Sequence, residues 1–250
     1  WDSGSAKVAA GLGAKARGTT SDGQAFTLGK LDMGEITRDE ALAHAEVIVS
    51  ATSLPVSGDF ENGYGDDPEY VADTIRLASE AGLAGCSIED THMADHSAYD
   101  FELAVERVRA AAAAARSLNS DFVFVARADG VMNGVYDMDE AIRRIRANEE
   151  AGADRLYDYM PPSMEDLARV CQTTTKPVNA LAAGKFAKAN RDAFAAIGVG
   201  RISLGSALSS VTHAALLKAA KGILNDGDFS ELLKGASSEE VEALLTHDRG

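Results

Sequence analysis

Short runs of apolar and β-branched residues alternate with longer amphipathic segments along most of this chain. The short runs predict β-strands at 14–20, 54–60, 84–90, 122–129, 154–159, 176–181 and 200–205. Amphipathic helices are predicted between them, for example over 67–82, 99–118 and 137–152. Strand and helix in regular alternation predict a parallel sheet whose strands are joined by crossover helices.

We predict a single domain over residues 1–250, because no linker interrupts this alternation, with a helical extension from about 206 to 250. The expected fold class is α/β, as a (β/α)8 barrel of the TIM type. The chain opens on a helical pattern and only seven strands are predicted, so we expect the first strand of the barrel to be missing from it. An open doubly wound sheet is the alternative, but it needs a phosphate-binding glycine fingerprint after its first strand, and the sequence has none.

Composition narrows the range of partners and locations. The 250 residues are 46% hydrophobic, enough for a sizeable core. Acidic residues outnumber basic ones by 39 to 24, giving a net charge of -15, which argues against a nucleic acid or an anionic membrane as partner. The two cysteines have neither metal-site nor disulfide spacing, and no apolar run is long enough to span a membrane. We therefore expect a cytoplasmic protein.

Acidic residues follow several of the predicted strands. Asp59 and Glu61 end the strand in LPVSGDFENGYG, Glu89 ends the strand in CSIED, and Arg127 lies in VARADG. The carboxyl ends of parallel strands meet at one face, where the active sites of such folds lie. Strand alternation would place Asp59 and Glu61 on one side. It would also point Glu89 into the barrel mouth and Cys86 towards the helices, which makes that cysteine a poor nucleophile.

Several carboxylates around one mouth suit a hard divalent cation held by oxygen ligands. Mg2+ fits best, with Mn2+ as the alternative, because Mg2+ uses a few carboxylates and keeps water and substrate oxygens as further ligands. The competing interpretation is that these acids cap the helices that follow. We prefer capping for Asp66 and Asp67. For Asp59, Glu61 and Glu89 we prefer the metal, since capping does not require acids two residues apart on a strand.

Taken together, these motifs resemble the phosphoenolpyruvate mutase/isocitrate lyase superfamily over essentially the whole chain. The segments that carry the resemblance are WDSGSAKVAAGLG, TTSDGQAFTLGKLD, LPVSGDFENGYG, GCSIEDT, VARADG, PVNALA and GRISLGSAL. The resemblance implies a barrel whose last helix is swapped between subunits, in dimers of dimers. It also implies a central Mg2+ site used on 2-oxo acids or on substrates that become enolates.

The resemblance also assigns roles to individual positions. The metal-binding acids would be Asp59, Glu61, Glu89 and Asp32, some of them acting through water. The substrate would be bound by Thr20, Ser21, Asp22, Arg127 and Asn179. Enolate charge on the substrate would then be stabilised by the metal with help from Arg127 and backbone amides.

The loop EDTHMADHSAYDFE, over 89–102, departs from the family pattern. It contains neither the cysteine of the lyase signature Lys-Lys/Arg-Cys-Gly-His nor the lysine that mutases and hydrolases carry after Glu-Asp. His92 and His96 lie in this loop and are candidates for catalytic acid/base groups beside Glu89 and Arg127, because histidine titrates near neutral pH. The alternative is that both are ordinary exposed loop residues. The exact reaction therefore stays open.

The sequence as a whole predicts a Mg2+-dependent enzyme that cleaves a C–C bond in a small 2-oxo or 2-hydroxy carboxylic acid through an enolate, as a lyase or decarboxylase. The alternatives are a mutase or hydrolase of phosphonate P–C bonds, and a non-catalytic binder of 2-oxo acids. A phosphate-binding barrel built on GRISLGSAL is a further alternative, but it leaves the clustered acids unexplained. The expected partners are a small carboxylate substrate and other copies of this chain.

Overall fold

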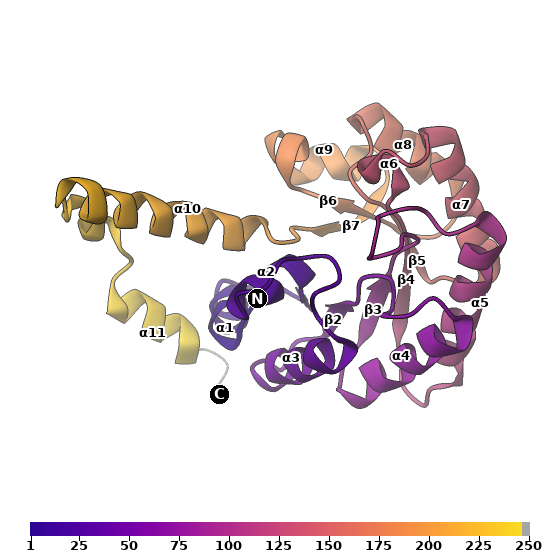
Figure 1. Ribbon diagram of the computed structural model, residues 1–250, viewed down its shortest axis with the longest axis horizontal. Helices are drawn as coiled ribbons and strands as arrows, with labels where there is room; N and C mark the ends of the chain where they lie inside the picture. The colour runs from indigo at the N-terminus through magenta and orange to yellow at the C-terminus, as the bar shows by residue number, and fades with distance from the viewer. Residues whose placement is uncertain (247–250) are drawn as a thin grey trace.

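A computed structural model describes residues 1–246 and shows one parallel sheet surrounded by helices (Figure 1). The strands are hydrogen-bonded in chain order, each parallel to the next. Their bounds are β1 Arg17–Gly18, β2 Val56–Asp59, β3 Gly85–Ile88, β4 Val123–Ala128, β5 Arg155–Asp158, β6 Val178–Leu181 and β7 Val199–Ser203. Every predicted strand is therefore confirmed.

Helices fill the connections between the strands. Their bounds are α1 Ser3–Gly11, α2 Ser21–Thr27, α3 Arg38–Ser50, α4 Pro68–Glu80, α5 Phe101–Ser117, α6 Gly130–Asn133, α7 Met138–Ala151, α8 Met164–Thr173, α9 Arg191–Ala196, α10 Ala207–Lys221 and α11 Ser238–Thr246. Short 3-10 or π turns cover Gly184–Lys188, Gly222–Asp226 and Ser230–Lys234. Helices α4, α5 and α7 confirm the three amphipathic segments predicted above.

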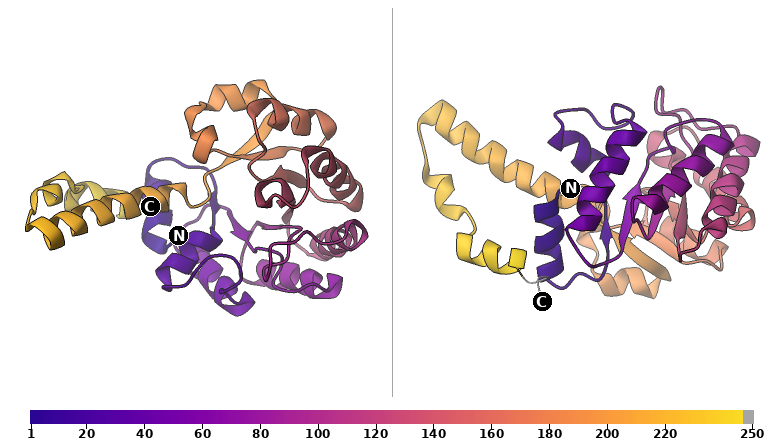
Figure 2. Two further views of the ribbon diagram at one scale, coloured as in Figure 1. Left: turned by 45° about the horizontal axis from the view of Figure 1, so that its top comes forward. Right: turned by 90° about the horizontal axis from the view of Figure 1, so that it is seen from below.

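The sheet curls into a partial barrel of seven strands, with helices on its outer side (Figure 2). The Arg201 side chain reaches from one edge strand, β7, to the other, β1: a Cβ atom on Gly18 of β1 would lie 3.7 Å from its guanidinium nitrogen. The side chain of Arg201 thus lies between the edge strands. The α/β barrel architecture is confirmed, and residues 1–246 do not form the alternative open sheet with helices on both faces.

Two apolar layers lie on opposite sides of the strands, as side-chain alternation requires. On β4, Phe124 and Ala126 pack into the large core between the sheet and the helices, whereas Val125 packs inside the barrel with Tyr157 and Leu181. Arg127 shares the inner side with Val125 because it lies two residues further along the strand. Cys86 is fully buried in the outer core, so the prediction that it faces the helices is confirmed.

Local signals in the sequence explain where the helices begin and end. The carboxylate of Asp67 accepts a hydrogen bond from the amide of Glu69, and Pro68 occupies the first turn of α4, as the capping interpretation predicted for Asp67. That interpretation is not confirmed for Asp66, whose Oδ1 accepts from the Tyr99 hydroxyl at 2.6 Å. Helix α3 begins with a reciprocal capping box between Thr37 and Glu40. Helix α7 is capped at its C-terminus by Gly152, whose φ of 107° favours a residue without a Cβ.

The C-terminal part forms an arm that leaves the barrel (Figure 1). Helix α10 extends outwards, and α11 returns to pack against α1, where Leu244 lies directly over Gly11. Helix α10 begins at Ala207, and the last four positions of the predicted helical extension, 247–250, lie outside the described residues. Within residues 1–246, none of the helices combines the length and apolar character that crossing a membrane requires.

Candidate active site

A cavity of about 600 Å3 opens inside the curled sheet. It brings together side chains from the ends of successive strands and from the loops that follow them. Six of the residues that line the cavity, each from a different strand or the loop after it, are Thr20, Asp59, Glu89, Arg127, Tyr157 and Asn179. The first and last of these residues, Thr20 and Asn179, are 159 positions apart in the sequence, and the fold brings them to one place.

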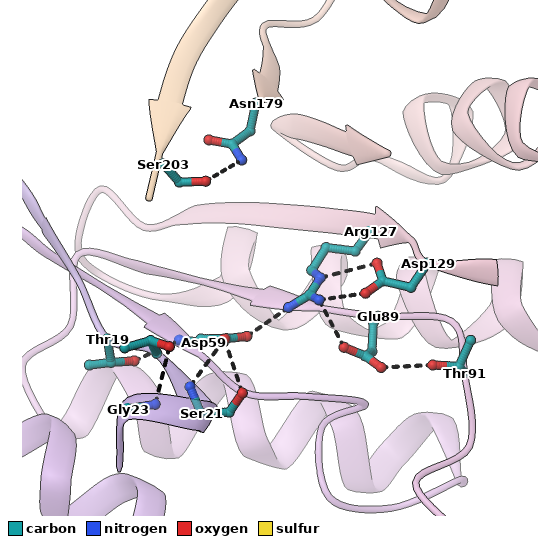
Figure 3. Close-up of polar contacts among 11 residues, drawn as sticks. Thr19, Ser21, Gly23, Asp59, Glu89, Thr91, Arg127, Asp129, Asn179 and Ser203 are labelled. Carbon is teal, nitrogen blue, oxygen red and sulfur yellow. Dashed lines mark hydrogen bonds and ion pairs between the residues drawn. The ribbon is translucent and has the colours of Figure 1, made fainter. Parts of the chain in front are cut away.

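Arg127 is the centre of the polar network in this cavity (Figure 3). Its guanidinium donates to Asp59 Oδ1 at 2.8 Å and lies 3.1 Å from Glu89 Oε2. On its third side it forms a bidentate pair with Asp129, which includes an Nε–Oδ1 hydrogen bond of 3.1 Å. The Arg127 side chain is 8% exposed, and three carboxyl groups surround its guanidinium.

Glu89 is held in place from the other side by Thr91. The hydroxyl of Thr91 donates to Glu89 Oε1 at 2.7 Å, while Glu89 Oε2 faces Arg127. Burial raises the pKa of Glu89, and the charge of Arg127 together with the Thr91 hydrogen bond opposes that effect. Both carboxylate oxygens of this glutamate are therefore engaged by the protein itself.

Asp59 also contacts the segment predicted to bind a substrate carboxylate. Its Oδ2 accepts from the backbone amide of Ser21 at 3.3 Å and from the Ser21 hydroxyl at 3.4 Å, and its own amide donates to Thr19 Oγ1 at 2.8 Å. Thr20 is the N-cap of α2, and its hydroxyl accepts from the amide of Gly23. The two bonds from Ser21 are longer than the usual 2.9 Å, so they are weak contacts that a better acceptor can replace.

Glu61 reaches the cavity by a route that strand alternation does not describe. Strand β2 ends at Asp59, and Glu61 adopts a φ of 44°, a left-handed conformation that is rare for a residue with a Cβ. Glu61 is 3% exposed, and neither of its carboxylate oxygens has a hydrogen bond of good geometry within the described residues, although the Gly34 amide is near enough to act on its pKa. Burial and the charges of Asp59 and Asp32 raise the pKa of Glu61 to about 7, despite the opposing effects of the Gly34 amide and Arg127.

The expectation that Asp59 and Glu61 share one face of a strand is thus corrected in its detail. The chain turns after Asp59, with the amide of Gly63 donating to the carbonyl of Phe60 at 2.7 Å. The left-handed residue at 61 then returns its carboxylate to the cavity that Asp59 also lines. The two acids meet because of this turn rather than because of strand pleating.

Asp32 is the fourth predicted metal-binding acid, and it also lines the cavity. Burial raises its pKa, with further contributions from the charges of Asp59 and Asp22, and its buried Oδ1 has no hydrogen-bond partner in the part of the chain that the structure describes. Buried carboxylate oxygens that lack partners are suitable ligands for a hard cation. Among residues 1–246, no three His, Cys, Asp or Glu side chains are close enough together to form a complete protein cage for a metal.

The opposite wall of the cavity carries Asn179 and two tyrosines. Asn179 is fully buried and donates to Ser203 Oγ at 2.9 Å, while its Oδ1 accepts no hydrogen bond from any described residue. The rings of Tyr157 and Tyr159 lie 5.5 and 4.9 Å from the Arg127 guanidinium carbon, within the range of cation–π attraction. A small polar molecule in the cavity could therefore contact a free amide oxygen on one side and aromatic faces beside it.

The remaining predicted site residues lie at the margin or away from the cavity. Asp22 lines the cavity and is exposed. The His92 ring packs against the ring of Tyr99, with centroids 3.8 Å apart and planes tilted by 48°, and lies 3.4 Å from Asp66 Oδ1, beside a second hollow. His96 is exposed and adopts a φ of 57°. The structure does not bring either histidine to the cavity that contains Arg127.

Two contributors to the site were absent from the predicted site residues. Asp129 could have been included because it lies two residues after Arg127 and faces the same side of the chain. Thr91 could not, since a hydroxyl two residues after an acid has no distinctive sequence pattern. Its buried hydrogen bond to Glu89 depends on the tight loop closed by the bridge between Thr91 and Ala98.

Comparisons with known proteins agree on one family. The profile of the family described as phosphoenolpyruvate phosphomutase matches residues 1–224. A crystal structure from Burkholderia cenocepacia J2315, named provisionally as a lyase/mutase, is 40% identical, with a TM-score of 0.92 over 97% of this chain and 87% of that one. A crystal structure of 2,3-dimethylmalate lyase is 30% identical, with a TM-score of 0.85 over 100% and 88% of the two chains.

Curated relatives match over shorter stretches. The 2,3-dimethylmalate lyase of Eubacterium barkeri is 33% identical over 69% of this chain and 61% of its own length. The 2-methylisocitrate lyase of Escherichia coli (strain K12) is 35% identical over 58% of this chain and 49% of its own length. The matched stretches thus span about half to three fifths of these relatives.

Proposed function

Because this chain belongs to the phosphoenolpyruvate phosphomutase family, we propose that it is a lyase that cleaves a C–C bond in a small 2-oxo or 2-hydroxy carboxylic acid. Two of its relatives, 2,3-dimethylmalate lyase and 2-methylisocitrate lyase, are named as enzymes of this type. The chain would share with them both the superfamily and the kind of substrate.

One observation of this structure carries the proposal. Arg127 is fixed at the barrel mouth by three acids while Glu61 and Asp32, beside it, keep carboxylate oxygens without partners among the described residues. The site thus combines the guanidinium of Arg127, held in one orientation, with carboxylate oxygens of Glu61 and Asp32 that would bind a metal ion. A reaction that develops negative charge on substrate oxygens needs this combination.

The acids fit a Mg2+ ion by their donor chemistry. Glu61 and Asp32 would hold it, because their buried oxygens lack partners, whereas Asp59 and Glu89 are already engaged by Arg127 and would act on the ion's water ligands. An ion that retains several waters does not require a complete protein cage. When bound, Mg2+ supplies positive charge that stabilises an enolate as it develops.

The residues of this chain would perform the other tasks. The amide and hydroxyl of Ser21 would donate to the substrate carboxylate in place of their long bonds to Asp59. Arg127, held in one orientation by its acids, would face the oxygen on which charge develops. Asn179 would accept a hydrogen bond from a substrate hydroxyl through its free Oδ1. Three separate contacts would then orient a small acid for cleavage.

A substrate panel tests the reaction. Methylisocitrate, oxaloacetate, substituted malates and phosphonopyruvate would each be incubated with the protein and Mg2+, with release of 2-oxo acid, CO2 and phosphate measured. We expect release of a 2-oxo acid from a substituted malate or a related acid, and none after chelation of the metal. Phosphonate chemistry is the second candidate, since a structure from Burkholderia cenocepacia J2315 that is 34% identical is named provisionally as a phosphonomutase. Turnover of phosphonopyruvate alone would favour it over C–C cleavage.

The metal assignment has its own test, which does not depend on turnover. Adding Mg2+ should raise the melting temperature of the wild-type protein, since a ligand that binds only the folded state stabilises it. Glu61→Gln should abolish most of that increase, whereas Glu46→Gln, an exposed control on α3, should preserve it. An unchanged Mg2+ effect in Glu61→Gln would remove this residue from the metal site.

The C-terminal arm supports self-association as a further part of the proposal. Val211, Leu216 and Leu217 on α10 are 66%, 60% and 55% exposed, which is unusual for apolar residues on a helix that packs within its own chain. We expect a second copy to cover them, in the swapped arrangement and dimer of dimers that the family resemblance implies. Light scattering should show an oligomer that Leu217→Glu disrupts and Ser210→Glu, a charge at an exposed polar position of α10, preserves.

A further inference from the structure

Behind the cavity, a second polar network is organised around Asp90. This residue follows Glu89, so the two side chains point to opposite sides of the chain, and Asp90 is 6% exposed in the layer between strands and helices. Its Oδ1 accepts from the backbone amide of Asp129 at 2.9 Å. Its Oδ2 accepts from the Tyr136 hydroxyl at 2.9 Å and from Arg144 Nη1 at 3.0 Å. Three donors thus hold one buried carboxylate in a single orientation.

The bond from Asp129 connects this network to the candidate active site. Asp129 uses its side chain to bind Arg127 and its backbone amide to bind Asp90. It is the N-cap of α6, yet its side chain makes no capping hydrogen bond to that helix. The peptide group that joins Ala128 to Asp129 is therefore held from outside the helix at both ends: its N–H donates to Asp90, and its carbonyl accepts from the Tyr159 amide at 3.1 Å.

The other two partners of Asp90 are themselves firmly held. The ring of Tyr136 packs directly on Gly130, where a Cβ atom would approach ring carbons to 2.1 Å. Arg144 on α7 also donates to the carbonyl of Tyr99 at 2.8 Å, and the amide of Tyr99 donates to the carbonyl of Asp90 at 3.0 Å. The Asp90–Arg144 pair thus fixes both ends of the loop between Thr91 and Ala98 as well as the turn after β4.

We propose that Asp90 is a positioning residue: through the Asp129 amide it sets the orientation of the Arg127 guanidinium in the cavity. The expected effect on kcat rests on the proposed function, whereas the expected effect on the orientation of Arg127 does not. A charged acceptor such as Asp90 forms stronger hydrogen bonds than a neutral one. Replacing its carboxylate with an amide would weaken the bond to Asp129 and place an NH2 group against the Asp129 amide or against the two other donors.

The test compares Asp90→Asn with a variant that is destabilised elsewhere. Val170→Ala removes two methyl groups from a fully buried position on α8 that does not line the cavity, so it serves as the matched control for stability. Tyr136→Phe removes one donor to Asp90 and provides a second, milder variant if Asp90→Asn does not fold. All proteins would be labelled with 15N-arginine, and the Arg127 Nε–H resonance would be identified by its loss in Arg127→Lys.

We expect the Arg127 Nε–H resonance to shift or broaden in Asp90→Asn, to move less in Tyr136→Phe and to stay in place in Val170→Ala. With an active substrate, kcat of Asp90→Asn should fall about 10- to 100-fold, the usual effect of losing a partner behind an active-site residue, while KM changes little. An unchanged resonance in Asp90→Asn, or in Tyr136→Phe if only that variant folds, would overturn the proposal. Equal changes in Asp90→Asn and Val170→Ala would overturn it as well.

The resonance measurement does not require turnover. If the wild-type protein cleaves no member of the substrate panel, the proposed function fails, and the position of the Arg127 resonance still decides whether Asp90 orients this guanidinium. If turnover is found and the resonance does not respond, the proposed function stands and the role of Asp90 is refuted.

Discussion

Asp158, at the end of β5, should make the stability of this protein depend on pH in a way that a single substitution removes. Its side chain is fully buried, and neither carboxylate oxygen has a hydrogen-bond partner in residues 1–246. Burial, together with the charges of Asp129, Asp90 and Asp166, raises the pKa of Asp158 to about 8 from its ordinary value of 3.8. The folded protein therefore retains a proton that the unfolded chain has already released at neutral pH.

The sign of the effect follows from this difference in bound protons. Between pH 4 and pH 8 the folded state binds about one proton more than the unfolded state, so the free energy of unfolding falls by about 1.4 kcal/mol for each pH unit. The interval from 3.8 to about 8 spans about four pH units, which sets an upper limit of about 6 kcal/mol for the total loss. Above about pH 8 both states are ionised, and the contribution of Asp158 no longer changes.

The assay is urea unfolding of the wild-type protein and of Asp158→Asn at pH 5, 6, 7, 8 and 9. Asparagine has nearly the same shape but does not titrate. The free energy of unfolding of the variant, relative to that of the wild type, should therefore rise from pH 5 to pH 8 and stay constant above pH 8. Asp121→Asn, at an exposed position, is the control and should follow the wild type. A difference between Asp158→Asn and the wild type that does not change with pH would refute the reasoning.

Three further substitutions test other parts of the structure by urea unfolding at pH 7. Gly130→Ala should cost about 1–3 kcal/mol because its Cβ would press into the ring of Tyr136, and a loss below 0.5 kcal/mol would contradict that contact. Arg127→Lys should cost on the order of 3 kcal/mol, since an ammonium cannot pair with all the surrounding carboxylates, and full stability would contradict the network. Thr91→Val should cost about 1–3 kcal/mol through the lost bond to Glu89, and an unchanged stability would argue that this bond is unimportant.

The elements of the fold were largely predictable because their signals are local. A parallel strand buried on both faces reads as a short apolar run, and the helix that follows it reads as an amphipathic repeat. The placement of Cys86 in the outer core was also predictable, since alternation along a straight strand leaves only two sides. Residues such as Asp67, at a helix start, could be interpreted from their immediate neighbours alone.

The candidate site was predictable only in part. The positions of Asp59, Glu89 and Arg127 followed from the rule that the strand ends of a parallel barrel converge, and the structure brings them into contact. The position of Glu61 did not follow from alternation, because the chain turns after Asp59. The positions of the loop histidines could not be predicted either, because a loop sequence does not specify the direction of its side chains. His92 packs against Tyr99, away from the cavity.

The sequence by itself determined the order of strands and helices, the side of each strand that faces the core, and the group of acids at one end of the sheet. These properties depend on the chemistry of neighbouring residues and on the periodicity of the backbone. Only the tertiary structure decided which acids pair with Arg127, which keep free oxygens, and that Asp90 reaches Asp129 from behind. Those outcomes depend on distances between segments far apart in the chain, and on burial, which governs how strongly each charge acts on the next.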